Sequence, residues 1–377
     1  MIYFDNAATG GRKPDVVLTA TLSAMKVCAN PGRSGHKLSI SCAKLVQDTR
    51  NELNSFFQGF GYDRVVFTKN CTEALNIALF GVLKKGDHVV ASCMEHNSVL
   101  RPLERLKKAG IITYDICPLT SDDKNGIISP ASVLSRIRTN TRLVAITSAS
   151  NVNGALSDIP AIRSALPENV LLLCDGAQGA GHLPIALTDW GVDLFTVAGH
   201  KGMFGIQGSG ALLFSERVDP EPIFYGGTGS ISLSLDMPDF YPDRLEAGTI
   251  SLPSIVSLLE GTRFLQENLN RVSARCTALT AYFLQELKKM PVYLPYSKQN
   301  PCGIVAFAHK KMQSEQLSEK LSSVYNVAVR GGLHCAPLMH EALGTLDGGL
   351  TRVSFSHYNT THEIDELLTA LDALQNE

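Results

Sequence analysis

Residues 170–201 read VLLLCDGAQGAGHLPIALTDWGVDLFTVAGHK, and this stretch decides the fold. It contains two runs that are apolar without interruption, VLLLCD (170–175) and LFTVAGH (194–200). Such runs are typical of strands that are covered on both faces, as in a mainly parallel sheet. Asp175 ends the first run, and His200 and Lys201 follow the second. Because parallel strands end at the same edge of a sheet, we expect these side chains to line one crevice.

Similar apolar runs on both sides of this stretch extend the predicted sheet. They are RVVFT (64–68), HVVAS (88–92), IITYDICPL (111–119), RLVAITSAS (142–150) and GALLF (210–214). Helical patterns lie between them, at 72–83 and at 128–138, where Ser129 and Pro130 begin the second helix. The alternation of strands and helices over 60–215 predicts an α/β domain with a parallel sheet.

The pattern changes after about residue 255. One long helix, or two joined helices, begins near 252, and shorter strands follow at 303–309, 326–332 and 351–357. A last helix begins at Thr360, whose spacing to Glu363 is that of a capping box. We therefore expect a large domain of residues 15–255. Residues 1–14 and 256–377 are expected to form a smaller α+β domain, packed tightly against it because no flexible linker separates the two.

Composition excludes several classes of protein. The chain has 377 residues, of which 44% are hydrophobic, and a net charge of −2 at pH 7, so no basic field attracts a nucleic acid. No window of about 18 apolar residues predicts a membrane span, and MIYFDNAATG is not a signal peptide. Nine scattered Cys without a CxxC motif favour reduced thiols in a cytoplasmic protein over a metal site.

An acid and a lysine at neighbouring strand ends suit the cofactor pyridoxal 5′-phosphate (PLP). The amine of Lys201 would bind the cofactor aldehyde covalently. The carboxylate of Asp175 would keep the pyridine nitrogen protonated, so that the ring accepts electrons. Either residue alone would be interpreted more simply as a helix cap. Together with Gln178 and His200, however, the pair predicts a PLP site.

These motifs, with YFDNAAT (3–9) and TRVSFSHYNT (351–360), resemble the class-V aminotransferase group of fold-type I PLP enzymes. Within that group the chain is most similar to the cysteine desulfurases and selenocysteine lyases, and the resemblance covers nearly the whole chain. It implies a mostly parallel seven-stranded sheet in a large domain, a small C-terminal domain, and a homodimer with shared active sites.

The resemblance also implies roles around PLP. His96, in MEH (94–96), would stack on the ring and take part in proton transfer, although a lone His is more often structural. Thr72 would bind the phosphate where a helix begins, and the alternative is a plain N-cap. The other implied cofactor residues are Cys71 beside Thr72, Asn151 near the ring hydroxyl and the substrate, Gln178 at O3′, and His200 at the phosphate.

Two sequence features concern the phosphate site that the resemblance implies. Gly248 and Thr249 match residues that reach across the dimer to the partner's PLP phosphate, whereas an exposed Gly-Thr would otherwise be interpreted as a turn. Ala198 occupies the position where the family usually has Ser or Thr, two residues before His200. One side-chain hydrogen bond to the phosphate is therefore missing, so another donor must replace it or PLP binds more weakly.

Two further matches concern the substrate. Arg352 matches the residue that grips the substrate α-carboxylate, for which a guanidinium is well shaped, and the alternative is a surface Arg at a strand start. Cys335, in RGGLHC (330–335), matches the loop cysteine that attacks the substrate sulfur, and the alternative is a buried inert thiol. Arg330 and His334 are expected to favour its reactive thiolate form.

The resemblance thus implies a PLP-dependent cysteine desulfurase. Such an enzyme converts L-cysteine to L-alanine, with Lys201 taking the α-proton, and keeps the sulfur as a persulfide on Cys335 for a protein or small-thiol acceptor. A selenocysteine lyase acting on L-selenocysteine, or another cysteine β-lyase, is the first alternative. The second alternative, from another class, is a protein that keeps the PLP fold as a binding scaffold without turnover.

Overall fold

The structure, a computed structural model, describes residues 1–27, 29–120 and 126–375. Its main layer is a seven-stranded sheet in the order β2-β8-β7-β6-β5-β3-β4. The strands are β2 (Val65–Thr68), β3 (Asp87–Ser92), β4 (Ile112–Cys117), β5 (Thr141–Thr147), β6 (Leu171–Asp175), β7 (Leu194–Ala198) and β8 (Gly210–Phe214). Only β8 runs antiparallel to its neighbours. Each strand overlaps one of the predicted runs, so the mostly parallel seven-stranded sheet is confirmed.

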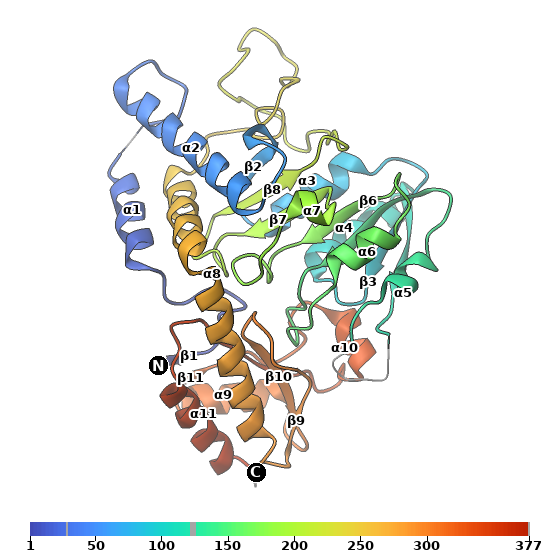
Figure 1. The fold of residues 1–377 in the computed structure, drawn as a ribbon, viewed down its shortest axis with the longest axis vertical. Coiled ribbons are helices and arrows are strands. Elements are labelled where there is room, and N and C mark those ends of the chain that lie inside the picture. Colours follow the sequence, from blue (N-terminus) through green and yellow to red (C-terminus); the bar gives the residue numbers. More distant parts are fainter. Residues whose placement is uncertain (28, 121–125, 376–377) are drawn as a thin grey trace.

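Helices cover both faces of this sheet (Figure 1). They are α1 (Asp15–Met25), α2 (Lys37–Phe56), α3 (Cys71–Val82), α4 (Asn97–Lys108), α5 (Pro130–Leu134), α6 (Ile159–Ala165) and α7 (Leu187–Trp190), with the short 3-10 helix η1 at Tyr62–Arg64. Leu143 and Leu173 are buried with the apolar faces of α3 and α4. Val144 and Leu172, one residue away in each strand, are buried on the other side with residues of α2, α5 and α6. Because successive strand residues point to opposite faces, this double cover explains the unbroken apolar runs.

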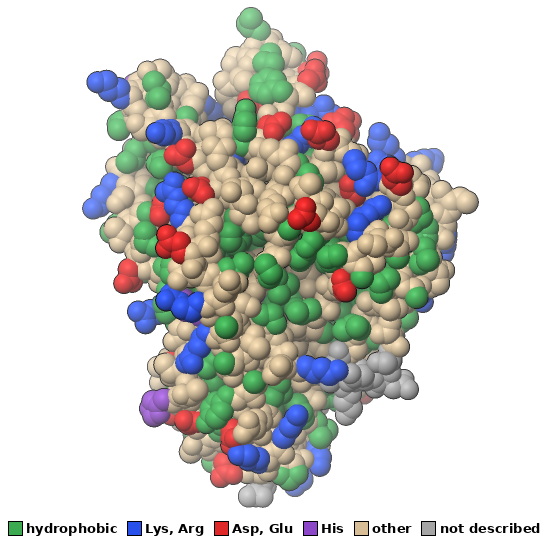
Figure 2. All heavy atoms as spheres, viewed as in Figure 1, with side chains coloured by type: hydrophobic (Ala, Val, Ile, Leu, Met, Phe, Trp, Pro, Cys, Tyr) green, Lys and Arg blue, Asp and Glu red, His purple; other side chains and the backbone are tan. Residues whose placement is uncertain are grey.

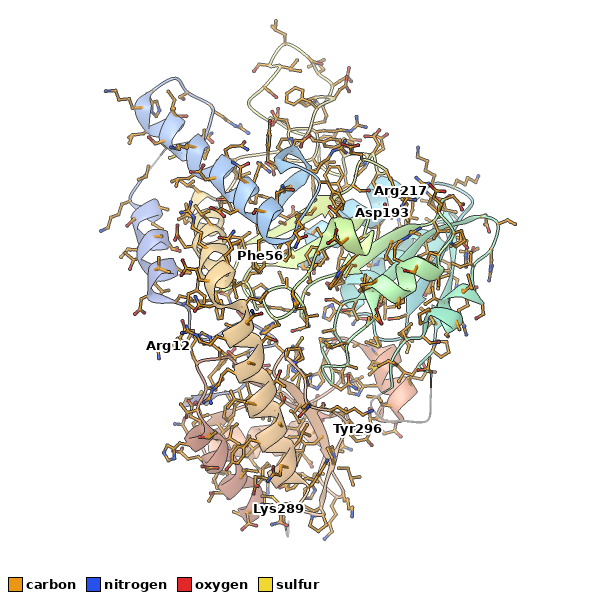
Figure 3. All side chains as sticks on the ribbon, in the orientation of Figure 1. Arg12, Phe56, Asp193, Arg217, Lys289 and Tyr296 are labelled. Carbon is orange, nitrogen blue, oxygen red and sulfur yellow. The ribbon has the colours of Figure 1, made fainter. Side chains whose placement is uncertain are left out.

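The amino ends of the central strands are tied together by one buried carboxylate. Asp193, just before β7, accepts a hydrogen bond from Leu172 N in β6 (2.9 Å). Its other oxygen accepts from Ser215 Oγ after β8 (3.1 Å) and from Arg217 Nη1 (2.9 Å), and Figure 3 shows Asp193 and Arg217 side by side. These bonds fix the register of three strands and leave the carboxyl ends free to form a site.

The C-terminal part has sheets of its own. These are a three-stranded antiparallel sheet, β12-β10-β9, and a two-stranded parallel pair, β1-β11. The elements are β1 (Ile2–Tyr3), β9 (Tyr293–Pro295), β10 (Ile304–His309), α9 (Ser314–Ser323), β11 (Val327–Ala328), α10 (Pro337–Leu343), β12 (Thr351–Ser354) and α11 (Thr361–Ala373). The capping box of Thr360 and Glu363 is confirmed. The strand expected at 326–332 is shorter than predicted, because its chain leaves the ladder after Ala328 to approach the cavity described below.

One helix joins the two parts. α8 (Leu252–Leu287) is a single helix of 36 residues, so the option of two joined helices is wrong. Its first half packs against α1 and α2, and its last turns join the core of the C-terminal part (Figure 1). β1 pairs with β11, so the N-terminal segment lies against the C-terminal part. The predicted boundaries at residues 14 and 255 stay a prediction.

The surface carries both signs of charge. Figure 2 shows acidic and basic side chains interspersed over the visible face, as a net charge of −2 leads one to expect. Among the described residues, no helix combines the length and the apolar character that a membrane span requires.

Candidate active site

A cavity of about 220 Å³ lies where β6 and β7 end. Parallel strands place their carboxyl ends together, which is why Asp175 and Ala198, the last residues of these strands, both line it. The predicted residues that line it are Cys71, Thr72, His96, Asn151, Asp175, Gln178, His200, Lys201 and Arg352, together with Ser98, Arg330 and His334. The cavity thus gathers residues that are far apart in the sequence.

Asp175 is buried and presents one free oxygen. Its Oδ1 atom accepts hydrogen bonds from Ala177 N (2.9 Å) and from the thiol of Cys71 (3.4 Å). None of the residues that the structure describes donates to Oδ2. Burial and the nearby Asp175 charge raise the pKa of Cys71 well above its ordinary value, so this cysteine is a neutral donor. The carboxylate therefore keeps one oxygen for a ligand in the cavity.

Lys201 and His200 lie in the turn that follows β7. The His200 carbonyl accepts hydrogen bonds from Gly10 N (2.9 Å) and Lys13 Nζ (3.1 Å), and Nδ1 of its ring lies 3.0 Å from Thr9 Oγ1. These contacts anchor the turn to the N-terminal segment. Burial lowers the pKa of Lys201, and burial with the adjacent Lys201 charge lowers that of His200 to about 4. The environment therefore favours the neutral, nucleophilic amine of Lys201.

His96 and Thr72 begin two neighbouring helices. Nδ1 of His96 accepts a hydrogen bond from Ser98 N (3.0 Å) and thereby caps α4. The cap of α3 is Asn70, whose side-chain oxygen accepts from Glu73 N (2.9 Å), so the alternative of Thr72 as a plain N-cap is wrong. The Thr72 hydroxyl lies instead 2.9 Å from that of Ser98.

Arg352 is held rigidly beside the cavity. It is 1% exposed, so the alternative of a surface Arg is wrong. Nη2 forms an ion pair with Asp5 (2.8 Å), and Nη1 donates to the Asn151 carbonyl (2.9 Å). Nε is buried without a hydrogen-bond partner in the described part of the chain. The guanidinium is thus oriented on one side by protein groups and retains donor capacity for a carboxylate.

Cys335 is the exposed cysteine among those that the structure describes, so it is not a buried inert thiol. It lies between β11 and α10, beside Arg330 and His334 of the cavity lining. His334 (φ 49°) and Cys335 (φ 57°) both adopt the left-handed conformation, which is strained for residues with a Cβ atom. Asn151 Nδ2 donates to the His334 carbonyl (2.7 Å), and Asn97 N donates to that of Cys335 (2.7 Å). The loop that carries the thiol is therefore fixed on both sides.

The expectation that His334 favours the thiolate is wrong. Its Nε2 atom lies 3.0 Å from the Leu350 carbonyl. Burial, together with the charge of Arg352, lowers its pKa well below the ordinary value, so the ring is neutral and supplies no positive charge. Arg330 remains in place for this role, with Nη2 3.9 Å from Cys335 Sγ.

Gly248 and Thr249 lie away from Lys201 in the single chain. They line a separate cavity of about 430 Å³, together with Lys69, Phe224 and Tyr225. This cavity is larger than the first, but it contains neither Lys201 nor Asp175. The role predicted for Gly248 and Thr249 requires a partner subunit and stays a prediction.

Sequence reasoning missed three residues that shape the site. Asp5 pairs with Arg352, and Ser98 links Thr72 to His96. Glu95 is fully buried, and burial raises its pKa to about 8, so its carboxyl group is largely protonated at neutral pH. Asp5 lies inside YFDNAAT, and Glu95 and Ser98 flank His96, so proximity to known motifs was the available signal.

A model of the aminotransferase class-V family matches residues 2–367. The chain belongs to this family. A probable cysteine desulfurase of Methanothermobacter thermautotrophicus is 30% identical over 383 residues, covering 99% of this chain and 94% of the relative. A probable cysteine desulfurase of Halalkalibacterium halodurans is 30% identical over 391 residues, covering 99% of this chain and 92% of the relative.

Solved structures of class-V relatives have the same fold. The apo structure of a cysteine desulfurase from Thermococcus onnurineus NA1 has a TM-score of 0.88 and 27% identity, and the match covers 100% of this chain and 94% of that one. The cysteine desulfurase CsdA of Escherichia coli has a TM-score of 0.87 and 25% identity, covering 98% and 94%. Both likenesses extend over the two parts of the chain.

Class-V aminotransferases use PLP, and the residues of the cavity fit it. The free oxygen of Asp175 suits a protonated pyridine nitrogen, and the amine of Lys201 suits an aldehyde. The start of α3 offers main-chain N–H groups and the Thr72 hydroxyl to a phosphate. Gln178 Nε2 donates to the Ala7 carbonyl (3.0 Å), which leaves its second N–H for a ring oxygen. Ala198 contributes no hydroxyl to the cavity, as the sequence indicates.

Proposed function

We propose that this chain is a PLP-dependent cysteine desulfurase that takes sulfur from L-cysteine onto Cys335 and releases L-alanine. The observation that carries the proposal is the position of Cys335. Its exposed thiol sits in a fixed loop beside the cavity that holds Lys201 and Asp175, with Arg330 within 3.9 Å. The curated relatives and solved neighbours named as cysteine desulfurases support it.

Each residue has a definite task in this proposal. Bound PLP supplies an electron sink for the α-carbon. Arg352 binds the substrate carboxylate, and Lys201, biased toward its neutral amine by burial, takes the α-proton. Cys335 then attacks the substrate sulfur as a thiolate, which Arg330 stabilises.

The sulfur transfer balances without another reactant. The bond between Cβ and sulfur of the substrate breaks, a sulfur–sulfur bond forms on Cys335, and Cβ takes up a proton. The carbon is reduced and the two sulfur atoms share the oxidation, so the products are alanine and a persulfide. We infer that a thiol of a protein or a small molecule then accepts the sulfur, for which the exposure of Cys335 gives access.

The experiment that tests this function compares two substrates. Purified PLP-loaded protein is given L-cysteine or L-selenocysteine, with and without a thiol reductant, and alanine is measured. Desulfurase activity predicts alanine from cysteine, with continued turnover only when reductant removes the persulfide. Alanine from selenocysteine alone would indicate a selenocysteine lyase, and alanine from neither would leave a binding scaffold.

Replacing Arg352 by Lys should raise the KM for cysteine. A lysine keeps the charge but loses the bidentate contact, which is worth roughly 1.5–3 kcal/mol, or about 10-fold to 150-fold in KM. PLP binding should survive, because the cofactor is held by other residues. KM is measured from alanine release, with the surface variant Arg138→Lys as the matched control. An unchanged KM would show that the carboxylate is held elsewhere.

We also infer that the active enzyme is a homodimer of a cytoplasmic protein. Apolar side chains are exposed along α1 and α2 and in the loop before α8, including Leu22 (56%), Ile40 (59%) and Leu235 (104%). A second copy would cover such side chains. All cysteines that the structure describes are free, which supports a reducing compartment.

Shared active sites predict complementation between two defective chains. Thr249→Ala should bind PLP at least about 10-fold more weakly, since a hydrogen bond to a charged group contributes roughly 1.5–3 kcal/mol. Mixed dimers with Lys201→Ala should regain tight binding in one site, because that site receives Thr249 from the other chain. PLP affinity and sedimentation are measured, with the exposed Thr369→Ala as control. Equal affinity for Thr249→Ala and wild type, or no recovery in the mixture, would contradict shared sites.

A further inference from the structure

Two donors of Ser98 lie close to one nitrogen of His96. Nδ1 of His96 lies 3.0 Å from the main-chain N of Ser98 and 2.9 Å from its Oγ atom. Burial and the charge of Lys201 lower the pKa of His96 to about 4, so the ring is neutral near pH 7 and Nδ1 offers a single lone pair. The backbone of α4 fixes the direction of the N–H, whereas the hydroxyl can rotate. Nδ1 therefore accepts from the N–H, and the hydroxyl proton of Ser98 needs another acceptor.

The hydroxyl of Thr72 is placed to be that acceptor. Its Oγ1 atom lies 2.9 Å from Ser98 Oγ, an ordinary separation for two hydrogen-bonded hydroxyls. Donation from Ser98 to Thr72 gives both donors of Ser98 an acceptor, whereas donation in the opposite direction leaves the Ser98 proton without one among these groups. The Thr72 proton is then free to point into the cavity, which both residues line.

That proton belongs to the part of the cavity that suits the cofactor phosphate. The first main-chain bond of α3 runs from Ala74 N to the Asn70 carbonyl (3.3 Å). The N–H groups of Cys71 and Thr72 precede this bond, so they are open to an anion. Thr72 is exposed in the single chain, so its hydroxyl has no fixed direction unless a neighbour orients it. Ala198 contributes no hydroxyl, which makes the direction of the Thr72 proton more important for the phosphate.

We propose that Ser98 is a positioning residue for the cofactor phosphate, because its hydroxyl donates to Thr72 Oγ1 and thereby directs the Thr72 proton toward the phosphate. A donor that is already oriented loses less rotational freedom when the phosphate binds. A hydroxyl that accepts one hydrogen bond also becomes a stronger donor in the next. Ser98 thus raises the affinity for PLP through Thr72. The inference goes beyond the proposed desulfurase function and needs no turnover of cysteine, so the two stand or fall separately.

Removal of the Ser98 hydroxyl should weaken the binding of phosphorylated cofactor selectively. Ser98→Ala should bind PLP about 5-fold more weakly than wild type, the factor that one ordinary hydrogen bond contributes. Pyridoxal has the same ring and aldehyde but no phosphate, so it should bind the variant and wild type equally. Apoprotein is titrated with each compound, and the visible absorbance of the bound form gives the dissociation constants. An equal loss of affinity for both compounds would show a general structural role and would overturn the proposal.

A double-mutant cycle tests whether Ser98 acts through Thr72. Thr72→Val removes the hydroxyl but keeps the branched shape, and it should weaken PLP binding by roughly 10-fold to 150-fold, the range for a hydrogen bond to a charged group. Adding Ser98→Ala to Thr72→Val should then change the affinity by less than about 2-fold, because the proton that Ser98 directs is already gone. A larger further loss would mean that Ser98 acts independently of Thr72, and would overturn the proposal.

Two further variants serve as controls. Ser98→Thr keeps a hydroxyl at this position and should retain the wild-type affinity for PLP. Ser164→Ala removes a helix serine that does not line the cavity and should have no effect. Ser98→Ala retains the main-chain N–H that His96 caps, so its apoprotein should melt at the wild-type temperature. An unchanged PLP affinity in Ser98→Ala, or a loss that is accompanied by a lower melting temperature of the apoprotein, would contradict the proposed role.

Discussion

Replacing Cys335 by Ala should stop alanine release from cysteine and leave the cofactor in place. The loss in kcat should be on the order of 10³-fold or more, the scale seen when a nucleophile is removed. The reason is that the other cysteines among the described residues are buried, and Cys71, which also lines the cavity, is kept as a neutral thiol because burial and the charge of Asp175 raise its pKa. Bound PLP is measured by its visible absorbance, and alanine by amino-acid analysis.

Two comparisons sharpen this experiment. Cys335→Ser keeps the size of the side chain and should be equally inactive, because oxygen does not accept the sulfur. Selenocysteine is the matched substrate, and its elimination should persist in both variants, since selenide leaves more readily. Turnover of cysteine at the wild-type rate would reduce the function to a β-lyase. Loss of PLP would instead show that Cys335 is a packing residue.

Replacing Lys201 by Ala should abolish the covalent link to PLP and lower turnover by a similarly large factor. Lys201 is the lysine that lines the cavity with Asp175, and its amine is biased toward the reactive neutral form. Borohydride reduction of wild type, followed by peptide mass analysis, should place the cofactor on Lys201. The variant should give no labelled peptide.

Lys13 provides the matched control for this prediction. Its Nζ atom lies 3.1 Å from the His200 carbonyl, and burial lowers its pKa to about 8, so it is a second reactive amine close to the site. Lys13→Ala should keep the label on Lys201. A label on Lys13 in wild type would contradict the assignment.

The sheet was predictable because its signal is local. Strands covered on both faces are apolar at every position, so β5 and β6 were visible as unbroken runs. The carboxyl ends of β6 and β7 then indicated where Asp175 and Lys201 meet. The length of β11 was not predictable. The chain after β11 bends toward the cavity and places Arg330 and Cys335 there, and this bend depends on tertiary contacts rather than on the local sequence.

The contacts within the site depend on pairs that only the fold creates. Asp5 and Arg352 are far apart in sequence, and their ion pair forms because the N-terminal segment lies beside β12. The error on His334 has the same origin. The charge of His334 was inferred from residue type, whereas burial and the nearby charge of Arg352 keep its ring neutral. Thr249 lines a cavity that does not contain Lys201, so its predicted contact with a cofactor phosphate needs a partner chain and stays a prediction.

The most direct test of the account is the chemical state of Cys335 after one turnover. PLP-loaded protein is mixed with one equivalent of L-cysteine without reductant, alkylated, digested and analysed by mass spectrometry. One additional sulfur atom, removable by reductant, is expected on the peptide that contains Cys335, with an equal amount of alanine released. Alanine release with an unmodified Cys335 peptide would contradict it.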